Sequence, residues 1–449
     1  MIKLLNNIKI FLNSKVYPLF VFLIAFIAHT FSIEEVCAGF LIFSAIVGLL
    51  ICDDLKFIIS PLFFFIFMFS EKSVSSDKFF EKPYLIAIVV LSLIVLTAFV
   101  FHFILHKKNI DLKSFYKSKL VFGVVLLSVS FLTNGLFSSA EYKYINIIFA
   151  FALIACLLFV YFIFSINLQK SENLKDYIFY ILFLLSILLS LQVFVTFASQ
   201  PIIENGQITK ESLLFGWGMW NNMGGMLAFF LPAHFYFACT VKKYGFIFYL
   251  TGIVSYVAII LTLSRSSLLV ASLIIIICII CCCFIGCNKL QSRILTFFLI
   301  LIGIVCVIFL REKILSLLND FISRGFDDNG RFKIYAYGIL NFLANPVFGR
   351  GFYSPFVLEH QFISFLPFRF HNTIIQMMTT CGTVGLVSYL WHRFETIRLI
   401  SKKRNKFTLF MFLSIASLLL CSLLDNHFFN LYPTFIYSVL LVILEKAEK

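Results

Sequence analysis

The sequence predicts an all-α, polytopic integral membrane protein with about 12–14 transmembrane helices. Of its 449 residues, 61% are hydrophobic and only 13% are charged, and the mean hydropathy is +1.00. Soluble domains do not have this balance. Apolar stretches long enough to cross a bilayer core of about 30 Å also recur from one end of the chain to the other. We therefore expect a single integral membrane domain over residues 1–449, with no separate soluble domain.

Fourteen candidate spans follow one another along the chain. They are 16–31, 36–52, 57–70, 84–105, 120–137, 144–165, 177–198, 221–241, 244–263, 266–286, 294–310, 372–391, 407–424 and 428–444. The second and third are short enough to form one re-entrant pair, so a count of twelve stays open beside fourteen. Lys3, Lys9 and Lys15 precede the first span, which is predicted to remain as an anchor and not to be cleaved.

The basic residues predict which side of the membrane each loop occupies. With both termini in the cytoplasm, the inner segments hold 23 Lys and Arg residues and the outer segments hold 13, seven of them within 311–371. Because basic residues concentrate on the cytoplasmic side, this alternation is favoured. The loop 393–406, which begins at Arg393, is among the most basic of the inner segments. The alternation places a smaller loop at 199–220, the turn at Arg265 and a large loop at 311–371 on the outer face. The net charge of +14 then follows from topology, and no nucleic acid partner is expected.

The large outer loop is predicted to contain helices of its own. Apolar residues recur at helical spacing over 312–324, which indicates an amphipathic helix lying on the membrane surface. A second helix is predicted over 331–343, ending at Asn345-Pro346. Gly349 and Gly351 indicate a tight connection after it.

Three residues of the outer segments are candidates for catalysis. Arg265 lies in a short turn between two spans beside Ser264, where it either binds an oxyanion or reaches to the membrane surface. Arg331 begins a helix, and a guanidinium at a helix start suits a phosphate, although a solvated arginine fits the position equally. His371 precedes a span and either accepts a proton from a hydroxyl nucleophile or is an ordinary interfacial histidine.

Other polar residues are weaker candidates for binding a substrate. Arg350 and Arg324 are candidate phosphate contacts in the outer loop. Asn222 could hold sugar hydroxyls, and Asn372 either orients a sugar or caps a helix. The polar turn Asp425-Asn426-His427 is expected to edge the same region. The chain has no paired-aspartate motif and no phosphate-binding glycine loop, so no metal or cofactor is expected.

Four segments, in this order, resemble the O-antigen ligase/polymerase (Wzy/WaaL-like) superfamily. They are Thr262-Leu263-Ser264-Arg265; Gly330-Arg331 with Tyr335; Asn345-Pro346-Val347-Phe348-Gly349-Arg350-Gly351-Phe352; and His371-Asn372-Thr373 followed by Gly382 and Gly385-Leu386. The resemblance covers about 245–390, and the N-terminal spans match only in hydropathy. Ser266 and Arg350 depart from it, because the superfamily more often has a glycine and a small or apolar residue there.

The resemblance implies a GT-C-like enzyme of the bacterial cytoplasmic membrane. Its reaction would be a metal-independent, inverting glycosyl transfer on the outer face, from a glycan on undecaprenyl pyrophosphate to a glycan or lipid-linked acceptor. By position, Arg265 and Arg331 would bind the pyrophosphate and His371 would orient or deprotonate the acceptor hydroxyl. The bilayer would supply the donor, and a chain-length regulator or a flippase would be a candidate partner.

Four functional hypotheses remain after this reading. The favoured one is a polymerase that joins repeat units of O-antigen or capsule, and the second is a ligase that moves a finished glycan onto lipid A-core or another acceptor. A flippase or transporter for lipid-linked glycans would need polar residues at mid-bilayer, whereas here they gather at the outer face. A non-catalytic scaffold would tolerate alanine at Arg265, Arg331 and His371.

Overall fold

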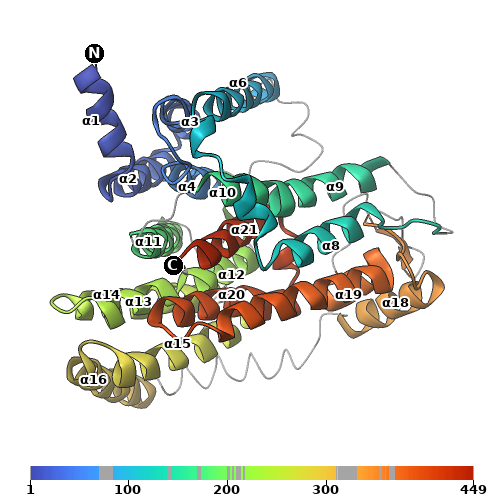
Figure 1. Ribbon diagram of the computed structural model, residues 1–449. Coiled ribbons are helices and arrows are strands. Elements are labelled where there is room, and N and C mark those ends of the chain that lie inside the picture. The colour runs from blue at the N-terminus through green and yellow to red at the C-terminus, as the bar shows by residue number, and fades with distance from the viewer. Residues whose placement is uncertain are drawn as a thin grey trace.

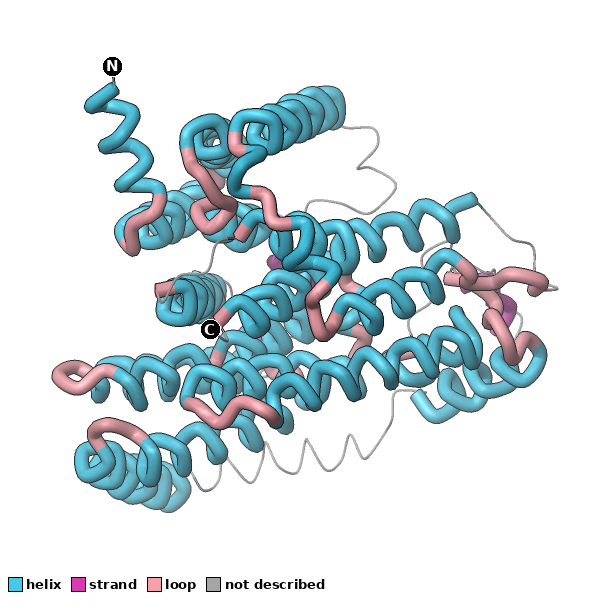
Figure 2. The backbone as a smooth tube through the Cα atoms, viewed as in Figure 1, coloured by secondary structure: helices cyan, strands magenta, loops and turns pink. Residues whose placement is uncertain are grey.

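A computed structural model describes residues 2–69, 84–138, 144–168, 173–199, 203–204, 207–208, 214–215, 218–309, 311, 331–352, 356–358, 361–363 and 370–447. The predicted surface helix over 312–324 and Arg324 lie outside these residues. Helices form nearly all of the described chain (Figures 1 and 2), which confirms the all-α fold class.

The helices begin with an unpredicted N-terminal one, α1 (Ile2–Leu12), bent by 72° from the first span. The others are α2 (Val16–Phe31), α3 (Glu34–Ile51), α4 (Ile59–Phe64), η1 (Phe65–Met68), α6 (Tyr84–Leu105), η2 (Lys107–Asn109), α7 (Leu112–Tyr116), α8 (Val121–Leu132), α9 (Tyr144–Ile154), η3 (Ala155–Phe159), α10 (Val160–Asn167), α11 (Leu174–Ser199), α12 (Trp220–Phe230), α13 (Pro232–Thr240), α14 (Gly245–Leu261), α15 (Arg265–Ile285), α16 (Lys289–Phe309), α18 (Arg331–Ala344), α19 (Thr373–Ser401), α20 (Lys406–Leu424), η5 (His427–Phe429) and α21 (Leu431–Lys446).

Three short antiparallel hairpins, which the sequence did not predict, interrupt two of the loops. They pair β1 (Ile203–Glu204) with β2 (Gln207–Ile208), β3 (Leu214–Phe215) with β4 (Gly218–Met219), and β5 (Phe356–Leu358) with β6 (Gln361–Ile363). The first two lie in the predicted loop 199–220 and the third lies in the predicted loop 311–371.

Each of the fourteen predicted spans coincides with a helix or with consecutive helices. Within the described residues, eight helices are long and apolar enough to cross a membrane, or up to ten if each bent pair is one span. This is fewer than the predicted 12–14, because several apolar segments form short helices. The segment 57–70, for example, is divided into α4 and η1, and α8 is only 12 residues long. The chain is nonetheless a multi-pass membrane protein.

The most buried span lies at the centre of the bundle. In the span formed by α12 and α13, 94% of an apolar 18-residue stretch is buried, whereas in α16 the corresponding share is 6%. α12 packs on α11, α15 and α20, and α15 begins with the candidate residue Arg265. α16 has few neighbours of its own and presents apolar side chains outward, as expected for a lipid-facing helix.

The helix α19 is broken at Gly382, and a loop fills the break. Gly382 has φ +66° and ψ −157°, so the helical hydrogen bonds cannot continue through it. The loop 346–351 replaces them: the amides of Arg350 and Gly351 donate to the Thr379 and Thr380 carbonyls at 2.7 and 3.1 Å. In return, the Thr383 amide donates to the Pro346 carbonyl at 2.8 Å. The predicted tight connection is confirmed, and its purpose is to brace the kinked helix.

Alanine at Gly382 will destabilise this brace. A Cβ there would lie 2.3 Å from the Val347 carbonyl oxygen, and the positive φ is unfavourable for any side chain. We expect Gly382→Ala to lower the free energy of unfolding by about 1–3 kcal/mol, measured by thermal unfolding in detergent. Gly303→Ala is the matched control, since a Cβ meets nothing within 4 Å there. Equal melting temperatures for both variants and wild type would contradict this account of the kink.

Candidate functional site

His371 pairs with a carboxylate that lies 54 residues further along the chain. Its Nδ1 lies 3.0 Å from Oδ1 of Asp425, at the end of α20. The His371 side chain is 37% exposed, whereas that of Asp425 is 11% exposed. In the tautomer in which the Nδ1–H group donates a hydrogen bond to Asp425, the free lone pair of the imidazole is on Nε2. The pair therefore consists of an accessible proton acceptor, Nε2 of His371, and a nearly buried carboxylate that holds the imidazole from the other side.

The surroundings of Asp425 keep it ionised. Burial by itself raises the pKa of this carboxyl, but the hydrogen bond from His371 and the charge of His427 outweigh burial. The backbone amide of Asn426 also donates to Asp425 at 2.8 Å. The net result is a pKa of Asp425 below its ordinary value of 3.8. A negative charge beside His371 is therefore present at neutral pH.

The start of α19 holds His371 in an unusual backbone conformation. His371 has φ +50°, and its carbonyl accepts a hydrogen bond from the Tyr335 hydroxyl at 3.3 Å. Asn372 follows as the N-cap, and its Oδ1 accepts from the amides of Ile374 and Ile375 at 2.9 and 3.1 Å. The capping alternative for Asn372 is thus confirmed, while its contact with a sugar stays a prediction.

Arg331 reaches the same place from a different helix. It is the first residue of α18, and its Nη1 donates to the Leu424 carbonyl at 3.1 Å. Leu424 immediately precedes Asp425, so the guanidinium lies beside the turn that orients His371. The predicted helix 331–343 is confirmed with almost the predicted bounds, and Figure 1 shows α18 lying beside α19.

Arg265 begins α15, and its N-cap is Ser264. Leu263 before it has φ +55°, which makes the turn between α14 and α15 abrupt. The Ser264 hydroxyl donates to the Ser267 hydroxyl at 2.9 Å instead of capping the helix. The first amides of a helix have no intrahelical acceptor, so this helix start favours an anion.

Two glycines of α12 connect the Arg265 turn with the His371 pair. A Cβ at Gly224 would lie 2.8 Å from the Ser267 hydroxyl, and one at Gly225 would lie 2.6 Å from Nε2 of His427. Because consecutive residues of an α-helix point about 100° apart, these close approaches place the start of α15 and the turn 425–429 on neighbouring sides of α12. Arg265 and His371 therefore flank the N-terminal part of one central helix.

Asn222 belongs to the same end of α12. Its Oδ1 accepts a hydrogen bond from Asn430 at 3.4 Å, just after the turn that carries Asp425. We call the region formed by the starts of α12, α15, α18 and α19, together with residues 425–430, the polar end. It contains six of the predicted site residues with described positions: His371, Arg265, Arg331, Asn222, Ser264 and Asn372, which is also the N-cap of α19.

Arg350 is not placed with this group. Its Nη1 donates to Oδ1 of Asn341 in the last turn of α18, and its own amide donates to the Thr379 carbonyl of α19. Thr379 lies seven residues, or about 10 Å of helix, beyond Asn372. Arg350 therefore joins α18 to α19, and a contact with phosphate there stays a prediction.

Asp425 is the site residue whose role the sequence did not reveal. The sequence indicated only that the turn 425–427 would edge the region. A carboxylate directly at the end of an apolar span was the available signal, but its partner is set by the approach of α19 and α20, which no local pattern encodes.

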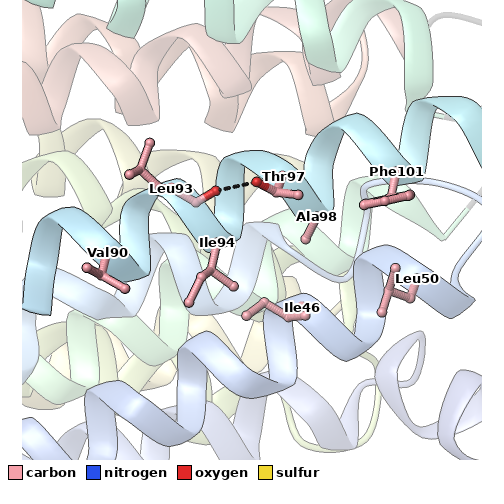
Figure 3. A pocket seen from close by; sticks show the side chains of 8 residues that line it. All are labelled: Ile46, Leu50, Val90, Leu93, Ile94, Thr97, Ala98 and Phe101. Carbon is pink, nitrogen blue, oxygen red and sulfur yellow. Dashed lines mark hydrogen bonds between the residues drawn. The ribbon is translucent and has the colours of Figure 1, made fainter.

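A groove on the opposite flank of the molecule has a different character. It lies between α3 and α6, has a volume of about 380 Å³ and is lined by eight side chains, of which only Thr97 is polar. Figure 3 shows that the Thr97 hydroxyl is directed back to the Leu93 carbonyl. The groove offers no group for catalysis, so the polar end remains the candidate site.

Residues 246–390 match the family model described as O-antigen ligase. The match contains Arg265, Arg331 and His371, and its bounds agree closely with the predicted region 245–390. Asp425 lies beyond its end. No curated protein matches the chain.

Proposed function

From the O-antigen ligase domain that this chain carries at residues 246–390, we propose a specific glycosyl transfer. The protein transfers a glycan repeat unit from undecaprenyl pyrophosphate, as a polymerase of bacterial surface polysaccharide such as O-antigen or capsule. The observation that supports this best is the placement of His371, Asp425 and Arg331 around one turn. A proton acceptor and an anion-binding group are thereby side by side.

In the proposed reaction, His371 accepts the proton of the acceptor hydroxyl at Nε2 as the oxygen attacks the anomeric carbon. The new glycosidic bond forms on the face opposite the breaking carbon–oxygen bond, so the anomeric configuration inverts. Undecaprenyl pyrophosphate leaves with the electron pair of that bond. Asp425 stabilises the imidazolium that results, and its ionised state at neutral pH suits this role.

Arg265 and Arg331 stabilise the charge that develops on the leaving pyrophosphate. A guanidinium presents a rigid fork of donors that matches phosphate oxygens, and the starts of α15 and α18 add favourable dipoles. Two arginines on an already good leaving group supply the electrostatic stabilisation that a divalent cation provides elsewhere. We therefore expect full activity in the presence of EDTA, and a strict requirement for Mg²⁺ would contradict the proposal.

Substrate binding extends from this centre to the polar side chains around it. Asn222, Ser264 and Asn372 line the same end and are proposed to contact sugar hydroxyls or phosphate. Arg350 and Arg324 are proposed as further contacts of the glycan phosphate. Ligation of a finished glycan to lipid A-core or another acceptor needs the same donor site and is the alternative within this class.

We further propose that the polar end faces away from the cytoplasm and that both termini are cytoplasmic. The charge bias supports this, because lysines gather at the opposite end of the bundle. There, Lys406 Nζ binds the Cys239 carbonyl at 3.0 Å and Lys446 Nζ binds the Ser114 hydroxyl at 2.7 Å. Such lysines are typical of the cytoplasmic side.

Asparagine at position 425 tests whether transfer needs the negative charge of Asp425 or only an oxygen of the same shape. Asp425→Asn keeps an oxygen that can accept from His371 but removes the charge that stabilises the imidazolium, so we expect transfer to fall about a hundredfold. A carboxylate with a lowered pKa is protonated only when the pH falls through that lowered value. Wild-type Asp425 therefore stays ionised from about pH 5 to 8, and its own titration adds no pH dependence to the loss in this range.

The matched control is Asp111→Asn, at the cap of α7, where asparagine caps as well as aspartate does. Initial rates across this pH range measure both variants. Wild-type rates for Asp425→Asn would remove the carboxylate from the mechanism.

A gel of surface glycan from a deletion strain tests the proposed function and separates its two forms. Single repeat units on the final acceptor identify the polymerase. Long chains that accumulate on the lipid carrier identify the ligase instead. An unchanged glycan in the deletion strain would contradict both.

A further inference from the structure

A buried arginine lies inside α19, far from the start of that helix. Arg393 was counted among the basic residues of the inner loop 393–406, but its side chain is only 8% exposed. Its guanidinium carbon lies 4.5, 4.4 and 4.9 Å from the ring centres of Tyr389, Phe428 and Tyr437. Its Nη1 also donates to the Tyr437 hydroxyl at 2.5 Å. We call these three rings the aromatic cage.

The aromatic cage surrounds the guanidinium of Arg393 where an ion pair with a carboxylate would be expected. Glu395, two residues along the same helix, instead accepts from the Gly123 amide and the Trp391 indole at 2.8 and 2.9 Å. Within the described part of the chain, Nε and Nη2 of Arg393 are buried without a hydrogen-bond partner. Burying a cation in a membrane protein is expensive, and aromatic faces offset only part of that expense. A residue placed at such a disadvantage is expected to have a role.

One ring of the cage belongs to the turn that carries Asp425. Phe428 is part of η5, and its amide donates to the Ser422 hydroxyl at 3.1 Å. The His427 amide donates to the Asp425 carbonyl at 3.0 Å, so the turn 425–429 is compact.

This turn therefore contacts α19 on both sides of its kink. Asp425 binds His371, which precedes Gly382 by eleven residues, and Phe428 packs on Arg393, which follows Gly382 by eleven residues. The kink would let the two halves of α19 move against each other, and the turn is attached to each half. A change at the Arg393 attachment should thus move Asp425 relative to His371.

We infer that Arg393 is a positioning residue, which holds the turn 425–429 on the second half of α19 through the aromatic cage and so keeps Asp425 aligned with His371. This rests on the proposed function of His371 as the proton acceptor. Arg393 itself is too deeply buried to contact the substrate.

Three substitutions and one control test the inference. Arg393→Met removes the charge at similar length, Arg393→Lys keeps a cation without the planar fork, and Phe428→Leu removes one ring of the cage. Arg398→Met is the control, because Arg398 lies on the same helix near its end and is exposed. If Arg393→Met does not fold, Arg393→Lys and Phe428→Leu still decide the question.

The first measurement is hydrogen exchange of the peptide containing residues 425–430 in the purified full-length protein. We expect faster exchange in Arg393→Met and Phe428→Leu, a smaller change in Arg393→Lys and no change in Arg398→Met. Unchanged exchange of this peptide in the folded Arg393 and Phe428 variants would overturn the inference, and it does not depend on any activity.

The second measurement is the steady-state transfer rate. We expect kcat to fall about tenfold in Arg393→Met while KM for the donor stays the same, because Arg265 and Arg331 are untouched. Combined with Asp425→Asn, the loss should be no larger than for Asp425→Asn alone. Additive losses would overturn the inference. If exchange changes as expected but transfer does not depend on His371, the proposed function fails and the anchoring by Arg393 stands.

Discussion

Alanine at His371 will reduce glycosyl transfer by about 10²–10⁴-fold, the contribution typical of a positioned general base. The imidazole is the accessible group beside an ionised carboxylate, and Nε2 is its free proton acceptor when Nδ1–H is held by Asp425. The protein should still insert and fold, because His371 is partly exposed and is the last residue of the loop before α19. Initial rates with purified protein measure the effect.

His106→Ala serves as the control for this variant. His106 also faces a carboxylate, with Nδ1 3.6 Å from Asp53, but at the opposite end of the bundle. We expect it to retain activity. If His371→Ala transfers glycan at the wild-type rate, proton transfer by this residue is excluded and the acceptor must be deprotonated by another group.

Alanine at Arg331 will reduce kcat by about 10²–10³-fold, as expected when one donor to a developing oxyanion is lost. Arg331→Lys should recover only part of the activity, because an ammonium keeps the charge without the fork that binds two oxygens at once. The lysine side chain should also bind the Leu424 carbonyl less well than Arg331 does in the protein without substrate. Arg265→Ala is expected to cause a loss of similar size.

Arg293→Ala is the matched control, since Arg293 also donates to a backbone carbonyl, that of Cys283 at 3.2 Å, outside the polar end. Wild-type kcat for Arg331→Lys would mean that only the charge matters. Wild-type kcat for Arg331→Ala would remove the pyrophosphate role altogether.

The local part of this architecture could be predicted from the sequence. Arg331 begins a helix that ends before Pro346 in both the prediction and the structure, because an amphipathic pattern and a proline are local signals. All fourteen apolar segments contain helices, as predicted, because a run of apolar residues is also a local signal. Their breaks were less predictable: α19 is kinked at Gly382 because the loop 346–351 supplies replacement hydrogen bonds, and that pairing is not local.

The contacts that assemble the site were beyond sequence reasoning. Asp425 and His371 are 54 residues apart, and their pairing depends on how α20 packs on α19. Arg393 looked like an ordinary basic residue at the edge of a cytoplasmic loop. Its burial follows from three rings, two of which come from outside α19, so the sequence pattern alone pointed to the wrong environment.

The central claim is that this chain transfers a glycan from a polyprenyl pyrophosphate by means of His371 and the two arginines. The most direct test supplies purified protein in liposomes with an undecaprenyl pyrophosphate-linked repeat unit in the presence of EDTA, and follows the release of undecaprenyl pyrophosphate with glycan growth. We predict joined repeat units and free carrier with wild type, and neither with His371→Ala, Arg265→Ala or Arg331→Ala. Equal product from wild type and all three variants, or none from wild type without a divalent cation, would contradict the account.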